Sequence, residues 1–318
     1  MISYSIIIPH YNTPDLLIRC LKSIPKREDI QIIVVDDYSN KNTIDRISGI
    51  KKMFPHVTLF YSEKNGGAGA ARNIGLKHAS GKWVLFADAD DYFLNDAFKI
   101  FDCHCNNNED AILFGNKSIS TKDRINTRGD FINNIIGYHK QSLISSQLAF
   151  LCTWVPWAKM IKLNFIRKNN FKFEEIKYGN DVFWNAQIVA GTEMIAIFQD
   201  PVYAITQEEH SLTTNRDKTA FFIRYNTLKK VNQYLKKQKK TFLTQAIPLE
   251  FSLWAREIGL LFYIGFIFKS VKEHLMFEGK EQWMTFAKIN HSFLCLHPFL
   301  FIFILFFIPS CLLKLLRK

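Results

Sequence analysis

Cysteine is scarce in this chain: its 318 residues include six cysteines, scattered at positions 20, 103, 105, 152, 295 and 311. Such wide spacing argues against a disulfide framework and is compatible with a reducing compartment. Cys103, His104 and Cys105 form a C-x-C group, but metal sites usually space their cysteines as C-x2–4-C, and no partner cluster follows. We therefore expect neither a disulfide scaffold nor a metal site at these cysteines.

Sequence features that define several other protein classes are also missing. No basic segment precedes the first apolar run, at residues 3–9, so we expect no secretory signal peptide. The sequence has no internal repeats, and no motif interleaves basic and aromatic residues as nucleic-acid-binding modules do. Hydrophobic residues make up 48% of the chain and charged residues 22%, which excludes the disordered and fibrous classes. The sequence therefore indicates a globular protein that does not bind nucleic acid.

Positive charge is concentrated in the last third of the chain. Residues 1–110 hold 13 Lys and Arg against 14 Asp and Glu, and residues 111–215 hold 11 against 9. Residues 216–318 hold 17 against 6, which accounts for nearly all of the net charge of +12. We therefore divide the chain at these positions into two near-neutral segments and a basic, phenylalanine-rich tail.

The tail also carries the longest apolar runs, of 11 residues at Ile258–Phe268 and 10 at Phe299–Ile308. The second run reaches 21 residues, 293–313, only if two prolines, a histidine and a serine are included, whereas a spanning helix needs about 20 predominantly apolar residues. An interfacial or re-entrant helix, a single span and a buried core helix all remain open. Because basic residues flank these runs, we expect a helical tail that associates with the anionic cytoplasmic face of the cell membrane, as a peripheral or monotopic element or a single span.

Short β-branched runs alternate with helical patterns in the first 110 residues. Buried strands are predicted at 3–9 and 30–35, further strands at 57–61 and 83–87, and helices at 14–23, 43–54 and 70–79. This alternation, with a period of about 25 residues, predicts a doubly wound parallel α/β sheet. Beyond residue 110 we expect a strand at 111–114, irregular structure at 118–140, a strand pair at 196–205 broken at Asp200-Pro201, and a basic helix within 216–245.

An aspartate cluster, Asp88, Asp90 and Asp91, directly follows the strand expected at 83–87. Two carboxylates at i and i+2 beyond a strand end can face one site, where Mg²⁺ or Mn²⁺ could bridge them to a diphosphate. An acidic loop or a helix N-cap would explain the same residues without a ligand. Ligands of doubly wound sheets bind beyond the carboxyl ends of the strands, so the position of the cluster favours a site.

Two other polar clusters occupy equivalent positions. Asp36 and Asp37 follow the strand at 30–35 and could accept hydrogen bonds from a ribose or a base edge, or cap a turn. Residues 64–73 combine small residues, which let a ligand approach the backbone at a helix start, with Arg72, whose guanidinium suits a base or a phosphate. This is not the dinucleotide fingerprint, since Arg72 stands where its third glycine belongs.

Four motifs lie in order at these strand ends: P-H-Y-N at 9–12, V-V-D-D-Y-S-N at 34–40, N-G-G-A-G-A-A-R-N-I-G-L at 65–76 and F-A-D-A-D-D-Y at 86–92. Each is unremarkable alone, but together they resemble the family 2 glycosyltransferases of GT-A fold. The resemblance implies a Rossmann-like, mostly parallel sheet with flanking helices, a nucleotide-diphosphate-sugar donor and a Mn²⁺ or Mg²⁺ cofactor. It assigns Asp90 and Asp88 to the metal, as the D-x-D pair. It assigns the donor to Pro9, Tyr11, Asn12, Asp37, Lys64, Asn65, Gly67, Arg72 and Asp88.

A weaker resemblance extends to about residue 215. Residues 178–183 (Y-G-N-D-V-F) are similar to the acidic E-D motif of the family, whose final aspartate is the general base in inverting members. Asn180 replaces the usual glutamate, while Asp181 keeps the place of the base. The alternative role for Asp181 is the N-cap of a helix that begins at Val182.

Two further segments resemble parts of the family that contact the acceptor. Residues 157–160 (W-A-K-M) are similar to its W-x-K-L stretch, and His210 falls where members often carry a lid or acceptor loop. We therefore expect Trp157, Lys159 and His210 to lie near a lid or the acceptor.

The resemblance predicts an inverting enzyme in which 1–110 bind the donor, while 111–215 bind the acceptor and supply Asp181 as the base. The donor would be a UDP-sugar, and the acceptor a hydroxyl of a glycan or a lipid-linked carrier in cell-surface polysaccharide synthesis. Two alternatives remain. A nucleotidyltransferase also uses paired aspartates on an α/β sheet and would release pyrophosphate. A non-catalytic, nucleotide-sugar-binding membrane protein would bind nucleotides without transfer.

Overall fold

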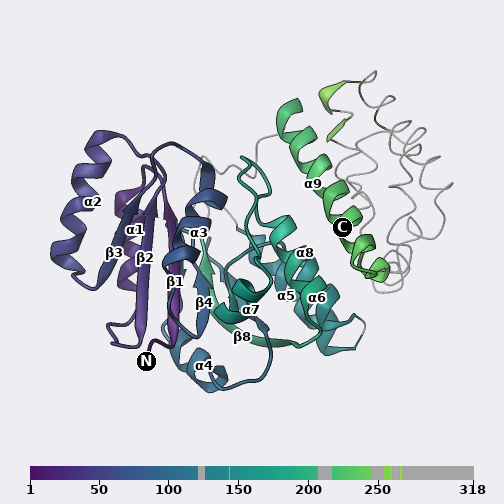
Figure 1. Ribbon diagram of the computed structural model, residues 1–318, viewed down its shortest axis with the longest axis horizontal. Helices are drawn as coiled ribbons and strands as arrows, with labels where there is room; N and C mark the ends of the chain where they lie inside the picture. Colours follow the sequence, from purple (N-terminus) through teal and green to yellow (C-terminus); the bar gives the residue numbers. More distant parts are fainter. Residues whose placement is uncertain are drawn as a thin grey trace. The chain divides into compact units, whose positions relative to one another are not determined.

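The computed structural model describes residues 1–120, 126–142, 144–206 and 217–244, together with positions 254, 255, 257–259, 262 and 266. The chain forms two compact units, Met1–Leu212 and Thr213–Lys318 (Figure 1). The first unit contains the sheet and all four sequence motifs, so it carries the candidate site.

The first unit is built on a single eight-stranded sheet (Figure 1). In spatial order its strands are β3 (Val57–Tyr61), β2 (Ile30–Asp36), β1 (Tyr4–His10), β4 (Trp83–Phe86), β7 (Lys159–Lys162), β6 (Ala111–Ser118), β8 (Ile195–Ile205) and β5 (Tyr92–Phe93). β1 to β4 pair in parallel, which confirms the prediction for the first half of the unit. Every residue of β1 is buried, as expected for a strand covered on both faces.

Helices flank the sheet of the first unit. They are α1 (Pro14–Lys22), α2 (Lys41–Met53), α3 (Gly67–His78), α4 (Ala97–His104), α5 (Arg128–Lys140), α6 (Ser146–Cys152), α7 (Leu163–Lys168) and α8 (Val182–Gly191). α3 packs against β1 and β2, and α5 packs against β6 and β8. Gly75 allows the first of these contacts, because a Cβ there would lie 2.4 Å from a methyl carbon of Ile7.

The second half of the unit differs from the sequence prediction in three ways. β7 lies antiparallel between β4 and β6, so the sheet is mixed there instead of continuing in parallel. α5 occupies a segment expected to be irregular, and its buried Ile132, Ile135 and Ile136 form the apolar stripe that packs on the sheet. β8 is one continuous strand, since a register shift at Gly115, opposite Pro201, absorbs the expected break.

The described part of the second unit includes α9 (Lys218–Lys237) and the short 3-10 helix η2 (Thr241–Leu243). α9 confirms the predicted basic helix, and the Asp217 side chain caps it by accepting the Ala220 backbone amide at 2.7 Å.

No helix in the part of the chain described by the structure is long and apolar enough to cross a membrane. Of the two apolar runs, 293–313 lies outside the described residues, and 258–268 is described only at 258, 259, 262 and 266.

Candidate active site

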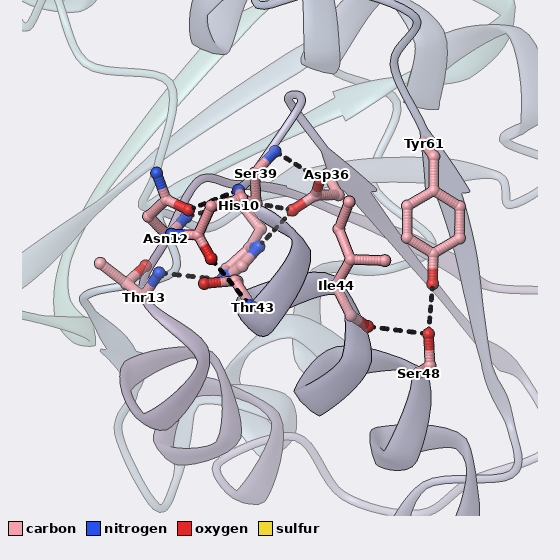
Figure 2. Close-up of polar contacts among 10 residues, drawn as sticks. His10, Asn12, Thr13, Asp36, Ser39, Thr43, Ile44, Ser48 and Tyr61 are labelled. Carbon is pink, nitrogen blue, oxygen red and sulfur yellow. Dashed lines mark hydrogen bonds and ion pairs between the residues drawn. The ribbon is translucent and has the colours of Figure 1, made fainter.

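A buried hydrogen-bond network joins the ends of β1 and β2 (Figure 2). The Thr13 amide donates to His10 Nε2 (3.2 Å), so the ring proton sits on Nδ1 and is donated to Asp36 Oδ1 (2.8 Å). The Ser39 amide and hydroxyl also donate to Asp36, at 2.9 and 2.6 Å. Burial alone would raise the pKa of Asp36, but these hydrogen bonds outweigh it and lower that pKa. Asp36 is therefore an ionised anchor for the two loops and has its carboxylate oxygens occupied.

Asn12 fastens the same two loops together (Figure 2). Its backbone N–H donates to Ser39 Oγ (2.8 Å), and its side-chain Oδ1 accepts the backbone N–H of Asn40 (2.9 Å). Tyr11 and Tyr38, in the loops that follow β1 and β2, are 51% and 59% exposed, so a planar ligand could stack on their rings. Pro9, by contrast, is buried within β1.

Asp37 binds the start of α3. Its Oδ1 accepts the Gly66 amide (2.9 Å) and its Oδ2 accepts the Gly67 amide (2.6 Å), across almost thirty residues of sequence. Gly67 has a φ of +80°, a conformation that favours glycine. Lys64 and Asn65 are exposed immediately before this turn, so cationic and amide groups flank the positive end of the α3 dipole.

Arg72 connects the two halves of the unit. Its Nη2 donates to Asp88 Oδ1 (2.6 Å) and its Nη1 to Asn180 Oδ1 (2.8 Å), and the guanidinium lies over the Phe173 ring at 5.3 Å. This close approach depends on Gly69, since a Cβ there would lie 2.1 Å from a backbone oxygen of Glu174. A buried guanidinium shared between a carboxylate and an amide holds the D-x-D segment next to the Asn180-Asp181 pair.

The aspartate cluster converges on one point. Carboxylate oxygens of Asp88, Asp90 and Asp91 all lie within 4.8 Å of one another. Asp91 is buried and accepts the Thr206 amide at 2.7 Å, and burial together with the other two carboxylates raises its pKa well above the ordinary value. Closely spaced, hard oxygen donors that repel one another suit a divalent cation such as Mg²⁺ or Mn²⁺. Sequence reasoning did not assign Asp91 to the metal, although it directly follows Asp90.

Asp181 occupies the N-cap position of α8, but its side chain makes no capping hydrogen bond. Burial raises the pKa of this carboxyl to about 6, while the cations of Arg72 and Lys159 oppose the rise and Asp88 adds to it. A carboxyl with its pKa near neutrality is suited to accept a proton at physiological pH. The carboxyl therefore does not make the N-cap hydrogen bond that the sequence offered as its alternative role.

Trp157 and Lys159 lie in the core beneath the site instead of at its surface. Trp157 stacks on Tyr203 at 5.2 Å between ring centroids, and the Tyr203 hydroxyl accepts the Asp88 amide at 2.8 Å. Lys159 is 1% exposed and donates to Thr153 O and Asn185 Oδ1. Trp157 therefore supports Asp88 through Tyr203, and Lys159 holds the first turn of α8 through Asn185. Their burial differs from the expected position near a lid or the acceptor. His210 lies outside the described residues.

Other supporting residues carry no sequence signal. The backbone carbonyl of Asp90 accepts hydrogen bonds from Arg19 and from the Thr206 hydroxyl, and these partners come from α1 and the end of β8. Because they are far apart in sequence and belong to no motif, only the folded chain identifies them.

The chain belongs to glycosyl transferase family 2, whose family model matches residues 5–166. A curated relative, the poly(ribitol-phosphate) beta-glucosyltransferase of Bacillus spizizenii, is 30% identical over 206 residues, which cover 63% of this chain and 31% of that protein. The poly(ribitol-phosphate) beta-N-acetylglucosaminyltransferase TarS of Staphylococcus aureus is 26% identical over 213 residues, covering 64% and 35%. The matched region thus spans about a third of these relatives.

Solved structures agree on the fold. The crystal structure of S. aureus TarS 1–349 matches with a TM-score of 0.57 at 20% identity, covering 81% of this chain and 70% of that one. The same fragment in complex with UDP-GlcNAc also gives 0.57 at 20% identity, with 81% and 71% covered. The chain therefore has an α/β, GT-A-like fold, as its sequence motifs predict.

Proposed function

We propose that this protein transfers a sugar from a nucleotide-diphosphate sugar to an acceptor hydroxyl with inversion at the anomeric carbon. The observation that carries the proposal is the Arg72 bridge, which joins Asp88 of the aspartate cluster to Asn180, the neighbour of Asp181. It brings a diphosphate-metal site and a group with a base-like pKa to the same edge of the sheet. Inverting transfer needs these two functions on opposite sides of one reacting carbon.

The donor site would be formed by the loops that the networks at β1, β2 and α3 hold in place. Tyr11 offers a ring to the base, Asn12 fixes its loop, and Asp37 lies beside the base and ribose while binding the turn before α3. Lys64, Asn65 and Gly67 place a cation, an amide and backbone N–H groups at the positive helix end, which favours a diphosphate. Pro9 contributes by shaping the end of β1.

Asp88 and Asp90, with Asp91 behind them, would hold a divalent cation, Mn²⁺ or Mg²⁺. When bound, the cation stabilises the negative charge that develops on the leaving diphosphate. The Arg72 guanidinium, fixed by Asp88 and Asn180, adds a permanent positive charge on the same side.

Asp181 would act as the general base. Its carboxylate takes the proton from the acceptor hydroxyl as that oxygen forms a bond to the anomeric carbon. The bond from this carbon to the diphosphate oxygen breaks in the same step, and the nucleoside diphosphate leaves. A single in-line displacement of this kind inverts the configuration.

The pH profile of transfer is expected to fall on its acid side near pH 6. The base must be ionised to accept a proton, and burial raises the pKa of Asp181 to about 6. Below that pH, kcat/KM should drop about tenfold for each pH unit, and above it the profile should level off. Initial rates between pH 4.5 and 9 test this, and an unchanged rate down to pH 5 would contradict the assigned base.

The nucleotide and the acceptor can be proposed from the relatives. Their names assign them glucosyl and N-acetylglucosaminyl transfer to poly(ribitol-phosphate), and TarS was solved with UDP-GlcNAc. We propose a UDP-sugar donor and a glycan or lipid-linked acceptor used in cell-surface polysaccharide synthesis. In this proposal residues 1–110 bind the donor, and residues 111–215 bind the acceptor and supply the base.

A donor panel tests the function as a whole. UDP-, GDP-, CDP- and dTDP-sugars are compared by thermal shift with Mn²⁺, and the stabilising donors are then incubated with polyol-phosphate polymers and lipid-linked glycans. We expect release of UDP together with a glycosylated product. Release of pyrophosphate would indicate a nucleotidyltransferase instead, and nucleotide binding without transfer to any acceptor would favour a non-catalytic binding protein.

We further propose that residues 216–318 bring the protein to the cytoplasmic face of the cell membrane, as a peripheral or monotopic element or by a single span. The support is the basic composition of this tail, with 17 Lys and Arg against 6 Asp and Glu, beside its apolar runs. The full chain should float with vesicles that contain phosphatidylglycerol, and flotation with purely zwitterionic vesicles should be weaker. Flotation with neither kind of vesicle would contradict the proposal, and equal flotation would show that the apolar runs and not the basic residues hold the tail on the membrane.

A further inference from the structure

Lys159 is a buried cation whose hydrogen-bond partners among the described residues include no carboxylate. Its ammonium group donates to the carbonyl oxygen of Thr153 (2.5 Å) and to Asn185 Oδ1 (2.6 Å), and it lies 4.1 Å from the centre of the Phe150 ring. The side chain is 1% exposed. Burial lowers the pKa of Lys159, whereas the charge of Asp181 opposes that shift. A buried lysine is costly for folding, so its position calls for a role beyond packing.

The lysine helps to fix the orientation of the Asn185 amide. An asparagine side chain has one oxygen that accepts and one nitrogen that donates, and an ammonium group can only donate. Oδ1 of Asn185 therefore faces Lys159 and Nδ2 faces the carbonyl oxygen of Asp181, at 2.9 Å, so these two partners together fix the amide. The Asn185 backbone amide donates to the same carbonyl at 3.1 Å.

The Asp181 backbone is thus held twice by one residue, at the first turn of α8. Asn185 is fully buried, so no solvent can replace either hydrogen bond. The Asp181 side chain itself makes no capping bond, and its direction therefore depends on how firmly its backbone is fixed. Lys159 lies on β7, which pairs with β4, and β4 ends just before the aspartate cluster. The contacts of Lys159 and Asn185 therefore connect the Asp181 backbone to the sheet that carries the donor site.

We propose that Lys159, acting through Asn185, is a positioning residue that sets the place of Asp181 relative to the donor. This inference rests on the proposed function, in which Asp181 is the base. Misplacement of a catalytic group by about 1 Å can cost about 100-fold in rate without loss of substrate binding. The expected signature is therefore a loss in kcat with little change in the KM of the donor.

Lys159→Met tests the proposal in the full-length chain, because methionine keeps the apolar stem and removes the ammonium group. On the alkaline plateau of the pH profile we expect kcat to fall about 10- to 100-fold. The KM of the donor and the UDP-induced thermal shift should stay within about twofold of the unchanged chain. Lys162→Met is the matched control, since Lys162 lies on the same strand and donates instead to Asn108 O at 2.7 Å. This control should retain kcat.

A second variant keeps the test decisive if Lys159→Met does not fold. Asn185→Asp still accepts from Lys159, so the buried cation keeps a partner, but it removes the amide donor to the Asp181 carbonyl. It too should lose kcat while retaining donor KM. In a double-variant cycle, the combined loss should be smaller than the sum of the two free-energy losses, because both changes break one chain of contacts.

The outcomes separate this inference from the function on which it rests. If the unchanged chain transfers sugar and both variants keep its kcat, the positioning role is wrong and the proposed function stands. Equal losses in kcat and donor affinity would show a general structural role and would also overturn the inference. Absence of transfer by the unchanged chain with every donor and acceptor would overturn the proposed function together with it.

Discussion

Asp181→Asn is expected to reduce sugar transfer by about 10²- to 10⁴-fold, the range that a general base contributes. Asparagine has nearly the same shape but cannot accept a proton at neutral pH. The carboxylate makes no capping hydrogen bond to α8, so the exchange should leave the fold intact. UDP binding, measured by thermal shift or calorimetry, should stay close to that of the unchanged chain. The acid limb near pH 6 should disappear from the residual activity.

Asp200→Asn provides the control for this change. Asp200 is an exposed residue of β8, remote from the aspartate cluster in the chain, and its conversion removes the same charge. Its activity and pH profile should match those of the unchanged chain. Loss of nucleotide binding by Asp181→Asn would make Asp181 a structural residue, and retention of full transfer would exclude it as the base.

Asp90→Ala is expected to abolish the metal dependence of the protein along with its activity. Removing one of three convergent carboxylates lowers cation affinity, and loss of the charge stabilisation that a metal provides costs several kcal/mol, or about 10²- to 10³-fold in rate. The loop should keep its shape, because Arg19 and Thr206 bind the backbone carbonyl of Asp90, which the substitution retains. Thermal shift with Mn²⁺ and UDP, and turnover with added Mn²⁺, measure the two effects.

Asp96→Ala is the matched acidic control, since its exposed carboxylate pairs only at the surface with Lys99, at 2.8 Å. An ion pair this exposed is screened by water and contributes little to stability, so both activity and metal response should persist. The metal hypothesis fails if the unchanged chain turns over at its full rate in excess chelator. It also fails if Asp90→Ala retains a normal response to Mn²⁺.

The first half of the fold was predictable because its signals are local. β1, β2 and β4 are short, mostly apolar and buried runs, and β3 is a short run at the sheet edge. Parallel neighbours need a crossover connection, and α1, α2 and α3 supply it between these four strands. Polar residues that follow such strands must gather at one edge of the sheet. The order of the strands along the sequence therefore sufficed to predict that the aspartate cluster, Asp37 and Arg72 lie in one site.

The second half was less predictable because its elements depend on distant partners. β7 has only four residues, and its antiparallel place between β4 and β6 follows from backbone pairing with strands some fifty to eighty positions away. The stripe of Ile132, Ile135 and Ile136 on α5 has helical spacing, but polar neighbours hid it. The break expected at Asp200-Pro201 is absent because Gly115 on β6 lets the neighbouring strand shift its register.

The sequence by itself determined the family, the parallel half of the sheet and the residue types of the site, since periodic burial and strand-end motifs are written in consecutive residues. Only the tertiary structure decided which of these residues are buried supports with occupied polar groups and which make no capping contact. Asp36 is an occupied anchor, whereas Asp181 makes no capping bond, and Trp157 and Lys159 are buried supports. The physical reason is that burial and hydrogen-bond partners belong to pairs far apart in the chain, such as Arg72 with Asn180 and Lys159 with Asn185.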